Sequence, residues 1–418
     1  MKTVVITGIG ICVPGHLKAA SLYDTLYRGQ SLLRKEVLDA KHGKHTQVCS
    51  SLGQDQLASI QHFYPALQHR GVSKAAAMGV YAAHEAVKHA GLQKLVDDRT
   101  GLFLGCNKTL IDIATHYSIW QLAEKGTPSL AHEHELALLR PNQCAEMVAQ
   151  QLQFSGLQMT FGDACTAGAI ALISGMRRIQ YGELDVAICG AAEHATHPLM
   201  QLAFAKLGAL SLNPNDDATA VCRPFDKDRS GCLLADASAF LILESVEHAH
   251  ARGKQPLAIL RAGIRQTEAH KFTSTAEDGR YYAKCMQSAL DSAAMKSDDI
   301  DHINAHGTST PSNDRAESRA IRDVFLHQPS VTSTKSALGH SLGASGAVEA
   351  ALCVESLVRQ KVLPTLNFHQ SGVDEPLLNI VQQGNEQALN NIMSNSFGFG
   401  GENASLIFSK AGNSEQGA

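Results

Sequence analysis

Short runs of apolar, mostly β-branched residues alternate along the chain with longer segments whose apolar positions recur at helical spacing. Runs of the first kind occupy residues 4–6, 102–104, 185–190 and 239–244. The segment Ala75–Ala90 has the helical pattern and is followed by Gly91, a residue type that commonly ends helices. Strands that are apolar on both faces are typical of sheets buried between layers of helices. The pattern therefore predicts an α/β fold.

The same order of elements starts again after residue 253. A strand is expected at Leu257–Ile264, a helix around Tyr282–Ala294, a strand at His302–Ala305, a helix from about Gly343 to Arg359 and a strand at Ala404–Phe408. A chain of 418 residues is also too long for one ordinary core. We therefore expect two similar halves, residues 1–253 and 254–410, followed by a loose polar tail, residues 411–418.

Composition and charge exclude several classes of protein. Hydrophobic residues make up 44% of the chain, charged residues 18%, and the net charge is -4. General nucleic-acid binders usually carry a strongly basic face, so this balance argues against one. The chain has no run of about 18 apolar residues, and Met1–Gly8 is better explained as a buried strand than as a signal peptide. We expect a cytoplasmic protein that does not span a membrane.

Ten cysteines are scattered singly through the sequence, and none of them forms a C-x-x-C pair. This spacing argues against structural zinc and against thioredoxin-type chemistry. Two histidine groups, His132 with His134 and His248 with His250, lack the spacing of a known metal-binding helix motif, and we expect them to be solvated. No metal site is therefore predicted, and scattered thiols suggest a reducing compartment.

Cys165 occupies a turn between a predicted strand and a predicted helix. The segment Gly162–Ala169 follows a strand-like Leu157–Phe161 and precedes apolar residues at helical spacing, which end near Gly182. Unpaired N–H groups at a helix N-terminus stabilise a thiolate by about 0.3–1 kcal/mol, and by up to ~2 kcal/mol when partly buried. A small buried hydrophobic residue is the alternative, and it is the preferred interpretation for Cys189, which lies inside a strand.

Two histidines are presented in turns rich in glycine and hydroxyl residues. His306 lies in Asn304–Pro311, directly after a predicted strand, where the active sites of α/β proteins gather. His340 lies in Ser333–Ala344, just before the helix that carries Glu349. A third turn, Ser396–Asn403, alternates Phe and Gly, as in loops whose backbone must approach another group closely.

Taken together, these segments resemble the elongating β-ketoacyl-acyl-carrier-protein synthases of fatty acid and type II polyketide synthesis. The resemblance covers nearly the whole chain, from Val4–Gly10 through Arg223–Arg229 to Phe397–Gly401, and its specific motifs are Asp163–Cys165, Asn304–Pro311 and Ser333–Gly346. It implies the thiolase fold, an α/β architecture of five layers, α-β-α-β-α, built from two similar halves. It also implies a homodimer, or a heterodimer with a ketosynthase homologue.

The resemblance assigns a role to each candidate residue. Cys165 would be the nucleophile, flanked by His306 and His340, with Lys335 and Glu349 as a supporting charged pair. The backbone N–H groups of Cys165 and Phe399 would form the oxyanion hole, and the Phe399 ring would control malonyl entry. Thr308 and Thr310 would bind the phosphopantetheine arm of an acyl carrier protein, while Phe204 and Phe397 would line the substrate pocket.

These roles define an acyltransferase that performs a decarboxylative condensation. The thiolate takes an acyl group from a carrier thioester, malonyl loses carbon dioxide, and the resulting carbanion attacks the acyl group on Cys165. The histidines would stabilise the developing enolate, and apart from the phosphopantetheine that carries the substrates no cofactor is expected.

Three related or rival classes fit less well. Thiolases need a second cysteine near the C-terminus, and the last cysteine here is Cys353. Non-catalytic chain-length partners lack the nucleophile that this chain keeps. A nicotinamide-dependent dehydrogenase is suggested only by Gly8-x-Gly10, because Val13 replaces the third glycine of the dinucleotide motif.

Several positions depart from common elongating enzymes, namely Met200, Ala235, Ala237, Lys271, Thr275, Glu402 and the turn at 105–108. These departures leave the chemistry in place and favour a specialised polyketide or aryl-polyene pathway over housekeeping fatty acid synthesis.

Overall fold

The structure is a computed structural model, and it describes residues 1–40, 43–64, 67, 72–93, 95, 98–107, 142–211, 217–373 and 378–412. The strands of its main sheet are β1 (Val4–Cys12), β4 (Thr100–Gly105), β5 (Leu157–Phe161), β6 (Val186–Glu193), β7 (Ala237–Ser245), β8 (Ala258–Thr267), β9 (His302–Asn304), β10 (Ser330–Thr332), β12 (Asn379–Ile380), β14 (Asn391–Gly398) and β15 (Glu402–Lys410). Two small sheets pair β2 (Arg34–Ala40) with β3 (Gly43–Cys49), and β11 (Lys361–Val362) with β13 (Asn385–Glu386).

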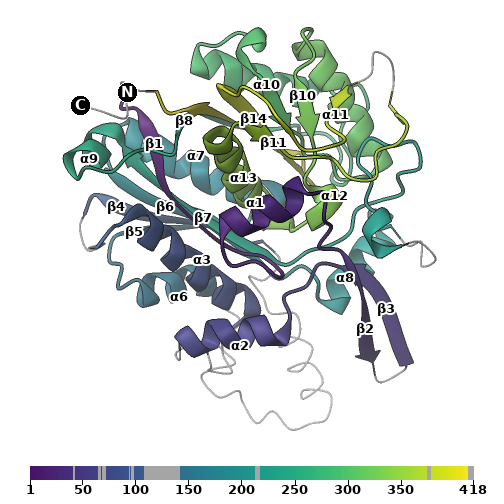
Figure 1. Ribbon diagram of the computed structural model, residues 1–418, viewed down its shortest axis with the longest axis horizontal. Coiled ribbons are helices and arrows are strands. Elements are labelled where there is room, and N and C mark those ends of the chain that lie inside the picture. Colours follow the sequence, from purple (N-terminus) through teal and green to yellow (C-terminus); the bar gives the residue numbers. More distant parts are fainter. Residues whose placement is uncertain are drawn as a thin grey trace.

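The helices lie on and between these strands (Figure 1). They are α1 (Ala19–Tyr27), α2 (Gln54–Phe63), α3 (Lys74–Ala90), α6 (Gln143–Gln151), α7 (Ala167–Gln180), α8 (Pro198–Lys206), α9 (Val246–Ala251), α10 (Arg280–Ala293), α11 (Pro311–Val324), α12 (Lys335–Leu338) and α13 (Ser345–Arg359). Two short 3₁₀ turns, η3 (Ala164–Thr166) and η6 (Leu342–Ala344), directly precede α7 and α13.

The sheet repeats one topology twice. Its order is β12-β10-β9-β14-β15-β8-β1-β7-β6-β4-β5, so β8 and β1 meet at the centre. Reading outward from the centre, one half runs β1-β7-β6-β4-β5 and the other runs β8-β15-β14-β9-β10. In both halves the first two pairings are antiparallel and the next two are parallel. The two halves are therefore alike in connectivity, although their sequences share no long identical run.

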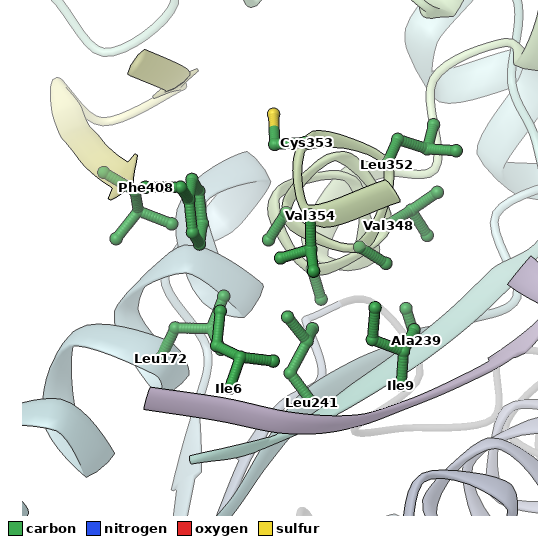
Figure 2. Packing of buried hydrophobic residues seen from close by; sticks show 14 of the residues in the cluster. Ile6, Ile9, Leu172, Ala239, Leu241, Val348, Leu352, Cys353, Val354 and Phe408 are labelled. Atoms are coloured by element: carbon green, nitrogen blue, oxygen red, sulfur yellow. The ribbon is translucent and has the colours of Figure 1, made fainter. Parts of the chain in front are cut away.

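The hydrophobic clusters show five layers. One cluster packs α3 and α6 against the outer face of the first half of the sheet, and another packs α10 and α11 against the outer face of the second half. A third cluster holds α7 and α13 between the two halves. Successive residues of one strand point to different clusters, as Cys189 of β6 faces the middle layer and Ile188 faces the outer one. Figure 2 shows α13 above Ile6, Ile9 and Leu241 of the sheet.

The predicted elements agree with the structure apart from their ends. The helix predicted at Ala75–Ala90 is α3, whose first turn is capped by the Ser73 hydroxyl and whose end is marked by Gly91 at φ 74°. The helix expected from Gly343 begins as η6 and continues as α13, and the last predicted strand is β15. Most of the predicted tail, residues 413–418, lies outside the described residues, as do His132 and His134.

Two features of the first half resolve questions that the sequence left open. A Cβ atom on Gly8 or Gly10 would collide with the backbone of Ala86 or Ala82 in α3, so these glycines let a helix lie against β1. The space that a dinucleotide would need beside them is filled. His248 is partly solvated, with 34% of its side chain exposed, and its Nδ1 lies 2.6 Å from Oε2 of Glu244, a buried carboxylate that Arg252 also binds.

Candidate active site

The turn that carries Cys165 holds the backbone in a sparsely populated conformation. It follows β5. Ala164, the residue before the cysteine, has a φ of 46°, a value that residues other than glycine rarely adopt. The Thr166 hydroxyl donates to the Asp163 carbonyl at 2.7 Å and closes the turn. Gly168 lets α13 approach, since a Cβ there would lie 2.9 Å from the Ala347 nitrogen. Cys165 is consequently fixed at the start of α7, with 7% of its surface exposed.

His340 reaches the cysteine from the second half of the chain. Its Nε2 lies 3.1 Å from Cys165 Sγ, and its Nδ1 lies 2.9 Å from the Ser345 hydroxyl. The backbone is held in place as well, because the His340 N–H donates to the Leu233 carbonyl at 2.6 Å. A hydrogen bond on each nitrogen fixes the orientation of the imidazole ring.

His306 stands at right angles to His340. The two ring centroids are 5.3 Å apart and the rings are inclined by 84°. The backbone N–H groups of His306 and Gly307 donate to the two carboxylate oxygens of Glu317, at 2.7 and 2.8 Å. One potential ligand atom from each of Cys165, His306 and His340 lies within 4.8 Å of the others. The sequence prediction that these three side chains meet is confirmed by their geometry.

A buried ion pair lies behind the histidines. Lys335, on α12, donates to Glu349, on α13, and each side chain is 2% exposed. Burial, with the Lys335 charge as a second cause, holds the pKa of both His306 and His340 well below its usual range. Burial also raises the pKa of Glu349, against the opposing effect of Lys335. Both imidazoles are therefore neutral near pH 7, and each can offer one N–H donor and one lone pair.

The sulfur and the two imidazoles open into a single cavity of about 70 Å³. Of the ten predicted site residues, eight line it, namely Cys165, Phe204, His306, Thr308, Thr310, His340, Phe397 and Phe399. The Thr308 and Thr310 hydroxyls lie 2.8 Å apart, and the Phe204 and Phe399 rings face each other at 6.0 Å. Lys335 and Glu349 are not among the described residues that line the cavity, and they pair with each other behind the two histidines.

The loop with alternating Phe and Gly runs along the cysteine. A Cβ on Gly398 would lie 3.1 Å from the Cys165 nitrogen, and Gly400 and Gly401 have φ values of 84° and 78°. The backbone at Gly398 can approach the nucleophile because this position carries no side chain, and Gly400 and Gly401 provide the left-handed backbone of the turn that follows. The arrangement is compatible with an oxyanion hole formed by Cys165 and Phe399.

Several residues that support the site were missed by the sequence reasoning. Glu317 and Ser345 hold the two histidines, and Glu268 and Tyr282 line the cavity. At the rim, Arg265 bridges Asp163 and Glu402. Glu317 lies on α11, six positions after the first residue of that helix, Pro311, and no local pattern in the sequence marked it. The same sulfur and imidazoles could also ligate a soft cation, so the expectation that no metal takes part stays a prediction.

Among the described residues, no helix combines the length and apolar character needed to cross a membrane.

Comparison with known proteins agrees with this geometry. The β-ketoacyl synthase N-terminal domain family matches residues 1–249, and the corresponding C-terminal domain family matches residues 257–369. The chain is 32% identical over 422 residues to the 3-oxoacyl-[acyl-carrier-protein] synthase 2 of Synechocystis, with 98% of each chain covered. It is 30% identical over 427 residues to the tetracenomycin polyketide synthase ketoacyl synthase alpha subunit of Streptomyces glaucescens, covering 98% of this chain and 97% of the relative.

A solved structure shares the architecture. It contains a type II polyketide acyl-carrier protein in complex with its ketosynthase bound to the hexaketide, and its similarity to this chain has a TM-score of 0.88 at 27% identity. The match covers 98% of this chain and 100% of that one. The predicted thiolase fold is thereby confirmed.

Proposed function

The chain belongs to the β-ketoacyl synthase family, and we propose that it extends an acyl chain held on Cys165 by two carbons taken from a malonyl thioester. It is a condensing acyltransferase of fatty acid or type II polyketide synthesis. The observation that carries the residue assignment is the 3.1 Å approach of His340 Nε2 to Cys165 Sγ, with His306 beside them in one cavity.

In the first step the Cys165 thiolate attacks the carbonyl carbon of an acyl thioester. The new carbon–sulfur bond forms on Cys165, and the carrier sulfur leaves and takes up a proton to become a thiol. The negative charge that develops on the carbonyl oxygen is met by the N–H groups of Cys165 and Phe399. The closeness of Gly398 to the Cys165 nitrogen supports this pairing.

In the second step malonyl loses its carboxylate. The carbon–carbon bond breaks, carbon dioxide leaves, and the electron pair moves onto the thioester as an enolate. His306 and His340 donate hydrogen bonds to the enolate oxygen, and Ser345, donating to Nδ1 of His340, keeps the proton of that ring on Nε2. The enolate carbon then attacks the acyl group on Cys165, which releases the extended β-ketoacyl thioester and restores the thiolate.

The substrates reach this site on the phosphopantetheine arm of an acyl carrier protein, which carries the two thioesters in turn. Thr308 and Thr310 bind the arm, Phe204 and Phe397 line the substrate pocket, and the Phe399 ring covers the malonyl entrance. All five residues line one cavity, which supports these assignments. The chemistry takes place entirely on the carrier thioesters and Cys165.

The protein acts as a dimer in the cytoplasm. Among the described strands, β5 forms one edge of the sheet and pairs only with β4, so a second copy, or a homologous ketosynthase subunit, can continue the sheet there. None of the ten cysteines, all of which lie among the described residues, forms a disulfide, as expected in a reducing compartment. We divide the chain at residues 253 and 254, between α9 and β8.

A specialised pathway suits the acyl side of the site. Met200, 5% exposed, packs in one cluster with Cys165 and Phe204, and its thioether fills and adapts the space beside the nucleophile. The acyl group that we propose for this site is an unsaturated chain of such a pathway.

A single assay tests these assignments. Purified protein is incubated with a panel of saturated and polyenoyl carrier thioesters, and the acylated residue is located by intact mass and peptide mapping. We expect one adduct on Cys165, none on a Cys165→Ala variant, and an undiminished adduct on a Cys189→Ala control.

Acylation of Cys165→Ala at the wild-type rate would refute the nucleophile. Equal turnover of long saturated chains and polyenoyl chains would refute the specialised pathway alone.

A further inference from the structure

A carboxylate that lines the cavity has one oxygen without a hydrogen-bond partner among the described residues. Glu268 is the one acidic residue among the described residues that line the cavity, and only 5% of its surface is exposed. Its Oε2 is the buried oxygen that none of those residues bonds. A buried acceptor that lacks a donor is unfavourable, and it marks a position where a ligand can supply the donor.

The other oxygen of the same carboxylate is held firmly. Glu268 Oε1 accepts from the Thr275 hydroxyl at 2.9 Å and from Asn403 Nδ2 at 2.9 Å. The Glu268 N–H donates to the Gly401 carbonyl at 2.9 Å, and a Cβ on Gly401 would lie 3.0 Å from Glu268 Cβ. The carboxylate is thus fixed in orientation, and its free oxygen is preorganised for a ligand.

The surrounding wall indicates what kind of group fits. Thr308 and Thr310 offer hydroxyl groups that can donate to a carbonyl, whereas Glu268 Oε2 can only accept while the carboxyl group is ionised. A secondary amide carries one acceptor and one donor on opposite sides of the same flat group. An arm that contains secondary amides could accept a hydrogen bond from a threonine hydroxyl and donate one to Glu268 Oε2. A plain alkyl chain could do neither.

We infer that Glu268 is a binding residue that accepts a hydrogen bond from a secondary-amide N–H of the arm that carries the substrate thioester. This inference rests on the proposed function, because that function brings an amide-containing arm into the cavity. Glu268 thereby selects thioesters by the chemistry of their carrier arm and leaves the chemistry of the acyl group to Cys165 and the histidines.

The test compares Glu268→Gln with wild type on thioesters that differ only in their amides. Glutamine keeps an oxygen for Thr275 and Asn403 and puts an NH₂ donor where the free acceptor was. Acylation of Cys165 is measured with acyl-pantetheine, which has two amides, with acyl-N-acetylcysteamine, which has one, and with an acyl ethanethiol ester, which has none.

Loss of a hydrogen bond to a charged acceptor is expected to raise KM for acyl-pantetheine by about 10-fold to 100-fold in Glu268→Gln, with kcat changed by less than about 2-fold. The ethanethiol ester should react equally with both proteins. The matched control is Glu277→Gln, which removes a carboxylate from an exposed position of the same segment outside the cavity lining and should behave as wild type. A similar rise in KM with acyl-N-acetylcysteamine would assign the contact to the amide nearer the thioester. An unchanged KM with that substrate would assign the contact to the farther amide.

A parallel binding measurement separates this inference from the proposed function. The dissociation constant of the unreactive thioether S-hexyl pantetheine is measured by calorimetry for wild type, Glu268→Gln and Glu277→Gln, with thermal unfolding as a check on folding. Weaker binding by Glu268→Gln alone supports the inference even if no thioester acylates Cys165, an outcome that would refute the proposed function.

The inference would be overturned if all three proteins bound S-hexyl pantetheine equally. It would also be overturned if Glu268→Gln lost as much reactivity toward the amide-free ester as toward acyl-pantetheine.

Discussion

The two sides of the cavity are formed by different kinds of residue. On the sulfur side, Cys165 packs among apolar residues, including Met200, Phe204 and Leu342. On the imidazole side, His306 and His340 are backed by the buried charges of Lys335 and Glu349. In the proposed mechanism one side stores an acyl chain, which needs apolar room beside a reactive atom. The other side would stabilise the enolate left by a departing carboxylate, which needs fixed donors whose charge state does not change.

The difference shows that burial serves opposite purposes on the two sides. Around the sulfur it removes apolar surface from water, which is favourable for each residue separately. Around the imidazoles it places charged groups in a medium where each depends on its partner. We therefore expect changes on the imidazole side to be strongly coupled.

The largest expected effect follows from separating Lys335 and Glu349. Replacing Lys335 by Met leaves the Glu349 carboxylate buried without a counter-ion, which costs about 3–5 kcal/mol. Urea unfolding measures this loss. Arg265→Met is the matched control, because Arg265 pairs with Asp163 and Glu402 but its side chain is 43% exposed, and its loss should cost less than about 1 kcal/mol. Equal losses of unfolding free energy in the two variants would show that the buried Lys335–Glu349 pair matters no more to stability than an exposed pair.

Removing one imidazole should affect one half-reaction more than the other. In His340→Ala we expect malonyl decarboxylation to fall by about 10²–10³, roughly 2.7–4 kcal/mol of barrier, because one donor to the enolate oxygen is lost. Acylation of Cys165 should fall much less. Both rates are followed separately, by release of labelled carbon dioxide and by intact mass. His302→Ala is a control, since His302 is buried in β9 and bonds Ser330 outside the described cavity lining. Normal decarboxylation by His340→Ala would remove this residue from the proposed mechanism.

A third expected effect is a gradual pH dependence of stability that belongs to Glu317. Burial, opposed by the backbone N–H groups that it accepts, raises the pKa of Glu317 from 4.5 to about 7. A raised folded-state pKa means that stability is present below pH 4.5 and is lost as the pH rises toward about 7. The free energy of unfolding of wild type relative to Glu317→Gln should therefore fall across this interval, by at most about 1.4 kcal/mol per pH unit.

The two histidines do not disturb this comparison. Their lowered pKa means that their contribution is lost as the pH falls below 6.5, but both proteins keep them, so it cancels in the difference. A difference that is constant from pH 4.5 to pH 8 would show that Glu317 has an ordinary pKa in the folded protein.

The local patterns predicted the elements well for a clear reason. Strands such as β6 are buried on both faces, so their continuous apolar sequence signals them directly, and α3 is bounded by Ser73 and Gly91. The same local reasoning missed the contact that His248 makes, because nothing nearby in the sequence shows that Glu244 is fully buried and binds it. It also missed Glu268, whose partners are Thr275, in the following loop, and Asn403, on the distant strand β15.

The sequence alone was enough to identify three chemically capable residues in turns, Cys165, His306 and His340, because glycine and hydroxyl residues around a reactive side chain are a local signal. Only the tertiary structure decided that they share one cavity, that burial, helped by the charge of Lys335, keeps both imidazoles neutral, and that Glu268 lines the same cavity with an oxygen that lacks a partner among the described residues. The physical reason is that charge states and unsatisfied hydrogen bonds depend on distance and burial. Both quantities arise only when the two halves of the sheet close around α7 and α13.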